Sequence, residues 1–129
     1  MSRLTEYDCS PKELSPLALA FVGDGVYDLI IREKLVCEAN RPVKTLNQKK
    51  VDIVRCQAQA ELVKKIEPFL TDEEKEVFRR GRNAHTGHCP KNASAADYHM
   101  ATGFEALIGY LYLCGNIKRI NELINSEQT

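Results

Sequence analysis

The strongest constraint on the fold is the run LALAFVGDGVYDLIIREKLV, which ends at about residue 36 and is apolar on nearly every face of a helix. Ser15 can accept hydrogen bonds from the free N–H groups of a first turn, and Pro16 suits the first helical position. A helix therefore begins here. A surface helix would show one polar stripe, so this run predicts a helix at the centre of a domain or at a subunit interface.

Two glycines and an acid interrupt this apolar run. Gly23 and Gly25 each cost roughly 1 kcal/mol of helix propensity, which predicts either close packing at these positions or room left for a ligand. Asp24 lies between them. An acid in an apolar helix must be buried, paired or directed at a cation, because buried carboxylates are rare unless they are compensated.

A second helical pattern runs from about residue 45 to 66. Its apolar residues recur near the three-to-four spacing of a buried stripe, and they are Leu46, Val51, Val54, Ala58, Leu62 and Val63. Pro68 ends the pattern. Thr71 and Glu74 have the spacing of a capping box, which predicts a short helix to about residue 80.

The last third of the chain predicts a loop and two more helices. GRNAHTGHCPKN is rich in residues that interrupt periodicity. Ser94 opens an S-x-x-D capping pattern, and the helix that follows should stop near Gly115. Asn116 can cap a final helix to about residue 125. Strand alternation is absent from the sequence, so the predicted class is all-α.

Length and composition limit the alternatives. The 129 residues, 43% of them apolar, suit one domain, which we place at residues 14–129 after a leader at 1–13. Lys+Arg and Asp+Glu are both 18, so any nucleic-acid surface must come from local clustering of charge. The five cysteines form no CxxC pair. With no signal peptide and no apolar run of about 18 residues, they predict reduced thiols in a cytoplasmic protein outside the membrane.

Glu105 is a second acid in a nearly all-apolar run, MATGFEALIGYLYL. If the two apolar helices pack side by side, a divalent cation between Asp24 and Glu105 would offset their repulsion. Oxygen ligands favour Mg²⁺, or Mn²⁺ in its place. The alternative is a pair of unrelated acids, each neutralised by an arginine such as Arg32 or capping a neighbouring turn.

Three ordered blocks resemble the ribonuclease III family. FVGDGVYDLIIR resembles its signature helix, FEALIGYLYL its second metal-site helix, and GRNAHTGHCPKN the loop of the mini branch, which lacks the double-stranded-RNA-binding domain. The resemblance covers roughly residues 15–113. It implies the ribonuclease III endonuclease-domain fold as a homodimer, which hydrolyses double-stranded RNA with Mg²⁺ bound by the catalytic residues Asp24 and Glu105.

The sequence departs from the longer enzymes of this family at two positions. They carry two further metal-site carboxylates where this chain has Ala20 and Thr102. Ala20 is four residues before Asp24, and Thr102 is three before Glu105, so each pair shares a helix face. This loss resembles the mini branch and leaves the number of metals open. A zinc site or a histidine acid–base pair at His85, His88 and Cys89 is a weaker alternative, because a fourth ligand at a usual spacing is missing.

RNA contacts must come from local polar and basic groups, because duplex RNA is recognised by its shape through phosphates and 2′-hydroxyls. The candidate RNA-binding residues are Lys49, Lys50, Arg79, Arg82, Asn83, Lys91 and Asn92. Solvated helix faces have the same composition, so the lysines alone do not identify an RNA-binding surface. Family resemblance suggests precursor 23S ribosomal RNA as the substrate, in rRNA processing and ribosome biogenesis.

Two other functions remain open at this stage. The first is a catalytically inactive ribonuclease III-like module that binds RNA and serves ribosome assembly. The presence of both Asp24 and Glu105 argues against it, since decay removes metal ligands first. The second is a plain helical dimerisation module. A homodimer is expected in any case, because so apolar a helix leaves more surface than one small core can cover.

Overall fold

The computed structural model describes residues 3–84, 89, 91 and 93–125, and within these ranges every regular element is a helix. The all-α prediction is therefore confirmed. None of the described helices is long and apolar enough to span a membrane. In chain order the elements are η1 (Pro11–Glu13), α1 (Pro16–Glu38), α2 (Val43–Val54), α3 (Cys56–Ile66), η2 (Glu67–Phe69), α4 (Asp72–Arg82), α5 (Ala95–Leu113) and α6 (Ile117–Asn125).

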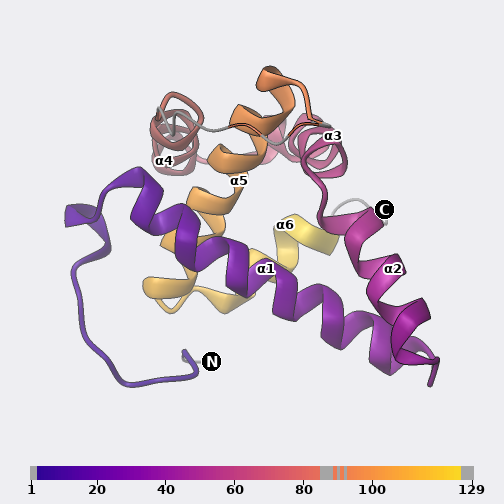
Figure 1. The fold of residues 1–129 in the computed structure, drawn as a ribbon. Helices are drawn as coiled ribbons and strands as arrows, with labels where there is room; N and C mark the ends of the chain where they lie inside the picture. The colour runs from indigo at the N-terminus through magenta and orange to yellow at the C-terminus, as the bar shows by residue number, and fades with distance from the viewer. Residues whose placement is uncertain (1–2, 85–88, 90, 92, 126–129) are drawn as a thin grey trace.

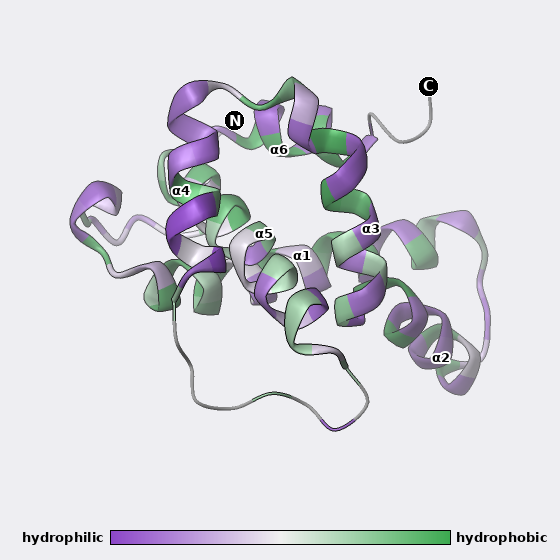
Figure 2. Cartoon of the chain, turned by 90° about the horizontal axis from the view of Figure 1, so that it is seen from above, coloured by the Kyte–Doolittle hydropathy of each residue, from purple (hydrophilic) through white to green (hydrophobic). Residues whose placement is uncertain are grey.

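Helix α5 is the centre of the fold. It crosses behind α1, and α3 and α4 lie on opposite sides of it in both views (Figures 1 and 2). Helix α2 packs on α1 instead (Figure 1). Phe104, Leu107 and Ile108 of α5 are completely buried, which explains why this segment is apolar around its whole circumference.

Helices α1 and α5 touch through their backbones. A Cβ atom on Gly23 would lie 1.7 Å from the carbonyl oxygen of Glu105, and one on Gly109 would lie 1.9 Å from that of Leu19. By contrast, a Cβ on Gly25 would meet no atom within 4 Å. Close packing is thus the reason for Gly23, whereas Gly25 faces open space.

The expected helix caps are confirmed. The Ser15 side chain accepts from the amide of Ala18, Thr71 and Glu74 form a capping box, and Ser94 accepts from the amide of Asp97. The Asn116 side chain accepts from the amide of Arg119 at 3.3 Å, at the start of α6. These short-range signals fix helix beginnings without help from tertiary packing.

The prediction of one helix over residues 45–66 is wrong. The chain breaks at Arg55, whose φ of −64° and ψ of 155° are extended, and α2 and α3 lie on either side of it. Because α2 packs on α1 and α3 packs on α5, one straight helix could not reach both surfaces. Val51, expected in the buried stripe, is 44% exposed.

The segment expected to be a leader is attached to the domain. Its residues 11–13 form η1, which contacts α5. The Leu4 amide donates to the hydroxyl of Tyr112, at the end of α5, over 2.7 Å. The segment is therefore attached at Leu4 and at η1, and the residues between these two points are exposed.

The backbone contact between α1 and α5 should make Gly23→Ala and Gly109→Ala strongly destabilising. Each added methyl group would overlap a carbonyl oxygen, so we expect a loss of more than about 2 kcal/mol in the free energy of unfolding. Gly25→Ala is the matched comparison within one chain, because a methyl group there meets no atom of that chain within 4 Å, so it should not show this loss. Urea unfolding at one protein concentration measures all three. Equal effects at Gly23 and Gly25 would contradict the contact.

Candidate active site

The crossing of α1 and α5 brings the two predicted acids together. Glu105 provides the carbonyl group that contacts α1 at Gly23, and Asp24 is the next residue along α1. Their carboxyl groups are hydrogen-bonded to each other. Asp24 is exposed and Glu105 is partly buried. The site is therefore open to solvent on the Asp24 side and closed on the Glu105 side.

The pKa of Glu105 is raised to about 8, first by burial and then by the charge of Asp24 and the hydrogen bond with it. Glu105 therefore keeps its proton at neutral pH. Arg32, named as a possible partner that neutralises Asp24, does not take that role. Arg32 binds Asp28 instead, at 2.5 Å.

Gln59 is a residue of this site that the sequence reasoning missed. It is 2% exposed, and its Nε2 atom donates to the Val54 carbonyl at 2.7 Å and to Oε2 of Glu105 at 3.4 Å. Among the described residues its Oε1 atom has no hydrogen-bond partner. A signal was present, because Gln59 stands three and four residues before the buried Leu62 and Val63, on the same helix face.

Cys56, at the start of α3, also lies near Glu105. Burial, and then the charges of Glu105, Cys89 and Asp97, raise the pKa of its thiol. A thiol that stays protonated is a poor nucleophile and a poor metal ligand. The Sγ atom of Cys89 donates to the Ala93 carbonyl at 3.5 Å. No motif or spacing in the sequence connects Cys56 with the acids.

A zinc site is absent from the part of the chain that the structure describes, where no three His, Cys, Asp or Glu side chains gather closely enough to bind a metal. His85 and His88 lie outside the described residues. All five cysteines are free thiols, as expected for reduced cysteines.

The two positions that lack carboxylates are buried beside the acids. Ala20 is 7% exposed and Thr102 is 5% exposed. The Thr102 hydroxyl donates to the Tyr98 carbonyl at 2.9 Å, so the hydroxyl proton is used within α5. Neither residue supplies a charged ligand, and a cation here would have to rely on Asp24, Glu105 and water.

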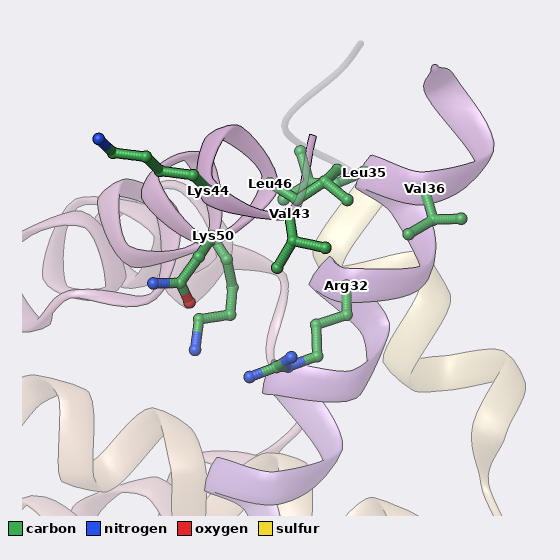
Figure 3. A pocket seen from close by; sticks show the side chains of 8 residues that line it. Arg32, Leu35, Val36, Val43, Lys44, Leu46 and Lys50 are labelled. Carbon is green, nitrogen blue, oxygen red and sulfur yellow. The ribbon is translucent and has the colours of Figure 1, made fainter. Parts of the chain in front are cut away.

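The two candidate RNA-binding residues of α2 differ in their exposure and in whether they are ion-paired. Lys49 is exposed. Lys50 is an ion-pair partner of Asp28 at 3.3 Å, and its side chain is only 16% exposed. Figure 3 shows Lys50 turned toward Arg32, whereas Lys44 extends away from both. Lys49 is therefore the more available cation of the two candidates.

The remaining RNA-binding candidates lie at the end of α4 and in the loop after it. Arg79 is paired with Glu76 at 2.5 Å, and the Arg82 guanidinium lies over the Phe78 ring, 5.8 Å from its centroid. Asn83 and Lys91 are exposed. Asn92 lies outside the described residues.

A groove of about 800 Å³ runs beside Asp24, between α1 and α6. It is lined mainly by apolar side chains, and Asp24 and Gly25 form part of its wall. Three of its apolar residues are unusually accessible, since Phe21 is 83%, Leu4 78% and Leu29 50% exposed. An exposed apolar face of this kind marks an interaction surface.

Comparisons with known proteins agree on one family. Residues 17–116 match the family model of the Ribonuclease III domain. The chain is 50% identical over 111 residues to a Mini-ribonuclease 3 of Thermoanaerobacter sp. (strain X514), over 86% of this chain and 78% of that one. It is 46% identical over 103 residues to a Mini-ribonuclease 3 of Synechococcus sp. (strain ATCC 27144 / PCC 6301 / SAUG 1402/1), over 80% of this chain and 73% of that one. A crystal structure of a Fusobacterium nucleatum protein superposes with a TM-score of 0.82 at 32% identity, over 91% and 93% of the two chains.

The raised pKa of Glu105 predicts how the stability of the metal-free protein depends on pH. Between its ordinary value of 4.5 and about 8, the folded state holds a proton that the unfolded state has released. The free energy of unfolding should therefore fall as pH rises through this window. Glu105→Gln should remove that contribution and be the more stable protein above pH 8.

Thermal unfolding in EDTA across this pH range measures the effect. Glu61→Gln, which changes an exposed glutamate of α3, is the control and should keep the wild-type pH dependence. A wild-type curve that Glu105→Gln leaves unchanged would contradict the raised pKa.

Proposed function

Since this chain belongs to the mini-ribonuclease III branch of the ribonuclease III family and is an endoribonuclease, we propose that it cleaves double-stranded RNA by Mg²⁺-dependent hydrolysis at Asp24 and Glu105. The observation that carries this proposal is the contact between the two carboxyl groups at the crossing of α1 and α5. Two acids placed against each other are unfavourable unless a proton or a cation lies between them.

The residues at the site fit a hard divalent cation. Asp24 and Glu105 offer carboxylate oxygens, which Mg²⁺ prefers, and Mg²⁺ usually keeps several waters when it is bound by one or two carboxylates. The buried Oε1 atom of Gln59, which has no partner among the described residues, can accept a hydrogen bond from such a water. Mn²⁺ suits the same oxygen ligands.

In the proposed reaction the chain binds the cation and positions the phosphodiester. Bound Mg²⁺ supplies positive charge for the phosphorane-like transition state and a more acidic water as nucleophile. Glu105 must first release its proton, so binding should strengthen as pH rises toward 8. Asp24 is exposed, which leaves the metal accessible to the RNA backbone. The protonated thiol of Cys56 takes no part as a nucleophile.

We assign RNA binding to the two groups of polar side chains described above. Lys49, Arg82 and Lys91 are the first choices, because Lys50 and Arg79 each have a carboxylate partner that RNA phosphate would have to displace. Asn83 and Asn92 complete the loop contribution. Phosphate contacts of this kind bind duplex RNA without reading its sequence. The proposed natural substrate is precursor 23S ribosomal RNA in the cytoplasm, where ribosome biogenesis takes place.

The proposed role of Asp24 is tested by Asp24→Asn. This change keeps the size of the side chain and removes the charge that binds the cation, so it should abolish Mg²⁺-dependent cleavage of a long duplex RNA. The fold and duplex binding should persist, because Asp24 is exposed. Cleavage and filter binding are measured on the same preparations. Cleavage by the variant at a near wild-type rate would place the active site elsewhere.

We further propose that a second copy of the chain covers the groove beside Asp24. Phe21, Gly25 and Leu29 recur at intervals of four on α1, which gives one continuous exposed face. A symmetric dimer through this face would bury the exposed apolar surface of both copies. It would also place an active site of each copy beside the interface, so that two sites can act on one duplex.

Phe21→Glu should convert the dimer to a monomer, because it places a charge in the middle of the apolar face. Phe69→Glu is the matched control, since Phe69 is also an exposed phenylalanine, at 66% exposure, but lies on η2 away from the groove. Sedimentation velocity at micromolar concentration distinguishes the two species. A wild-type protein that is only monomeric would contradict the dimer, and a dimeric Phe21→Glu would move the interface to another surface.

A further inference from the structure

We propose that Gln59 is a positioning residue of the active site, whose amide N–H holds the carboxylate of Glu105 and whose amide oxygen accepts a hydrogen bond from a water on the bound cation. This inference rests on the proposed metal site and adds a residue to it. Gln59 does not itself contact the reacting phosphate. It acts through Glu105 and through the hydration shell of the metal.

The orientation of the Gln59 amide is set by Val54. Because α2 ends at Val54, the carbonyl group of that residue has no partner in a following helical turn. The Nε2 atom of Gln59 donates to it at 2.7 Å. In the flipped orientation two oxygen acceptors would face each other at this distance, so the nitrogen must lie on the Val54 side.

The second N–H of the same nitrogen is then directed at Glu105. It lies 3.4 Å from Oε2 of Glu105, which is long for an N–H···O hydrogen bond. The carboxylate can therefore shift toward a cation and remain in contact with the amide. An N–H donor at this place favours the ionised carboxylate, which is the form that binds a metal.

The Oε1 atom of Gln59 is evidence that the site binds a ligand. It is buried and has no hydrogen-bond partner among the described residues, and a buried amide oxygen without a donor is unfavourable. The ionised forms of Asp24 and Glu105 have no proton to donate. Water on a bound Mg²⁺ would have one, and Ala20 and Thr102 offer no carboxylate that would take the place of such water.

The packing of α3 indicates that Gln59 has a role other than packing in the core. Gln59 lies on the helix face whose neighbouring residues, Leu62, Val63 and Ile66, are all buried and apolar. A side chain with only a packing role would be apolar at such a position, since a buried polar group costs free energy unless it is fully hydrogen-bonded. Within the described part of the chain the Oε1 atom of Gln59 has no hydrogen-bond partner, which a role in metal binding explains.

The experiment compares Gln59→Met with Gln57→Met. Methionine keeps the length of glutamine and removes both hydrogen-bonding atoms, and Gln57 is an exposed glutamine on the same helix. Binding of Mn²⁺ to the protein without RNA is measured by electron paramagnetic resonance, and cleavage of duplex RNA is measured against Mg²⁺ concentration. Gln59→Met should bind Mn²⁺ about 10- to 100-fold more weakly, as other residues that orient metal ligands do. Its Mg²⁺ midpoint should rise by a similar factor, and saturating Mg²⁺ should restore most of kcat.

Two further variants keep the result decisive. Gln59→Asn withdraws the amide by one methylene but keeps a polar group, so it should also lose Mn²⁺ affinity, and it replaces the methionine variant if that one does not fold. Wild-type Mn²⁺ affinity in the folded Gln59 variant would overturn the positioning role. If Asp24→Asn nevertheless loses Mn²⁺, the metal site stands without Gln59. Unchanged binding in Asp24→Asn would overturn the metal site and this inference together.

Discussion

The backbone contact between α1 and α5 is the constraint on which the site depends. Gly23 allows the carbonyl group of Glu105 to approach α1, and Gly109 does the same for Leu19 one turn away. A side chain at either glycine would separate the helices, and the carboxyl groups of Asp24 and Glu105 would no longer meet. The loss of helix propensity at Gly23 is therefore the cost of bringing the two acids together, and packing of the buried α5 offsets it.

This close approach also sets the electrostatics of the site. Glu105 is held in a partly buried position beside Asp24, and the result is a Glu105 pKa of about 8. The metal-free site is thus unfavourable when both acids are ionised. A cation would relieve this repulsion, so the arrangement that destabilises the free protein is the one that favours metal binding. The edge contact of Tyr27 with Phe104, whose ring centroids lie 5.0 Å apart, helps to hold the helices in this unfavourable arrangement.

Much of this architecture could be predicted from local sequence signals. Ser15, Thr71, Ser94 and Asn116 mark the beginnings of helices because their caps involve only the next few residues. Asp24 and Glu105 were recognisable because charge is out of place in an apolar helix. The break at Arg55 could not be predicted in this way, since neither proline nor glycine marks it and the apolar spacing continues through it. It follows from tertiary packing, in which α2 rests on α1 and α3 on α5.

The missed break and the missed residue Gln59 have one physical cause. In a continuous helix the Val54 carbonyl would accept from the backbone amide four residues later, at Ala58. The side-chain amide of Gln59 would then have no fixed partner. Because the chain is extended at Arg55, the first hydrogen bond of α3 runs from the backbone N–H of Gln59 to the Arg55 carbonyl. The Val54 carbonyl then accepts from the side-chain amide of Gln59 instead. The irregular backbone between α2 and α3 thus belongs to the proposed active site, because it orients the side-chain amide of Gln59 that faces Glu105.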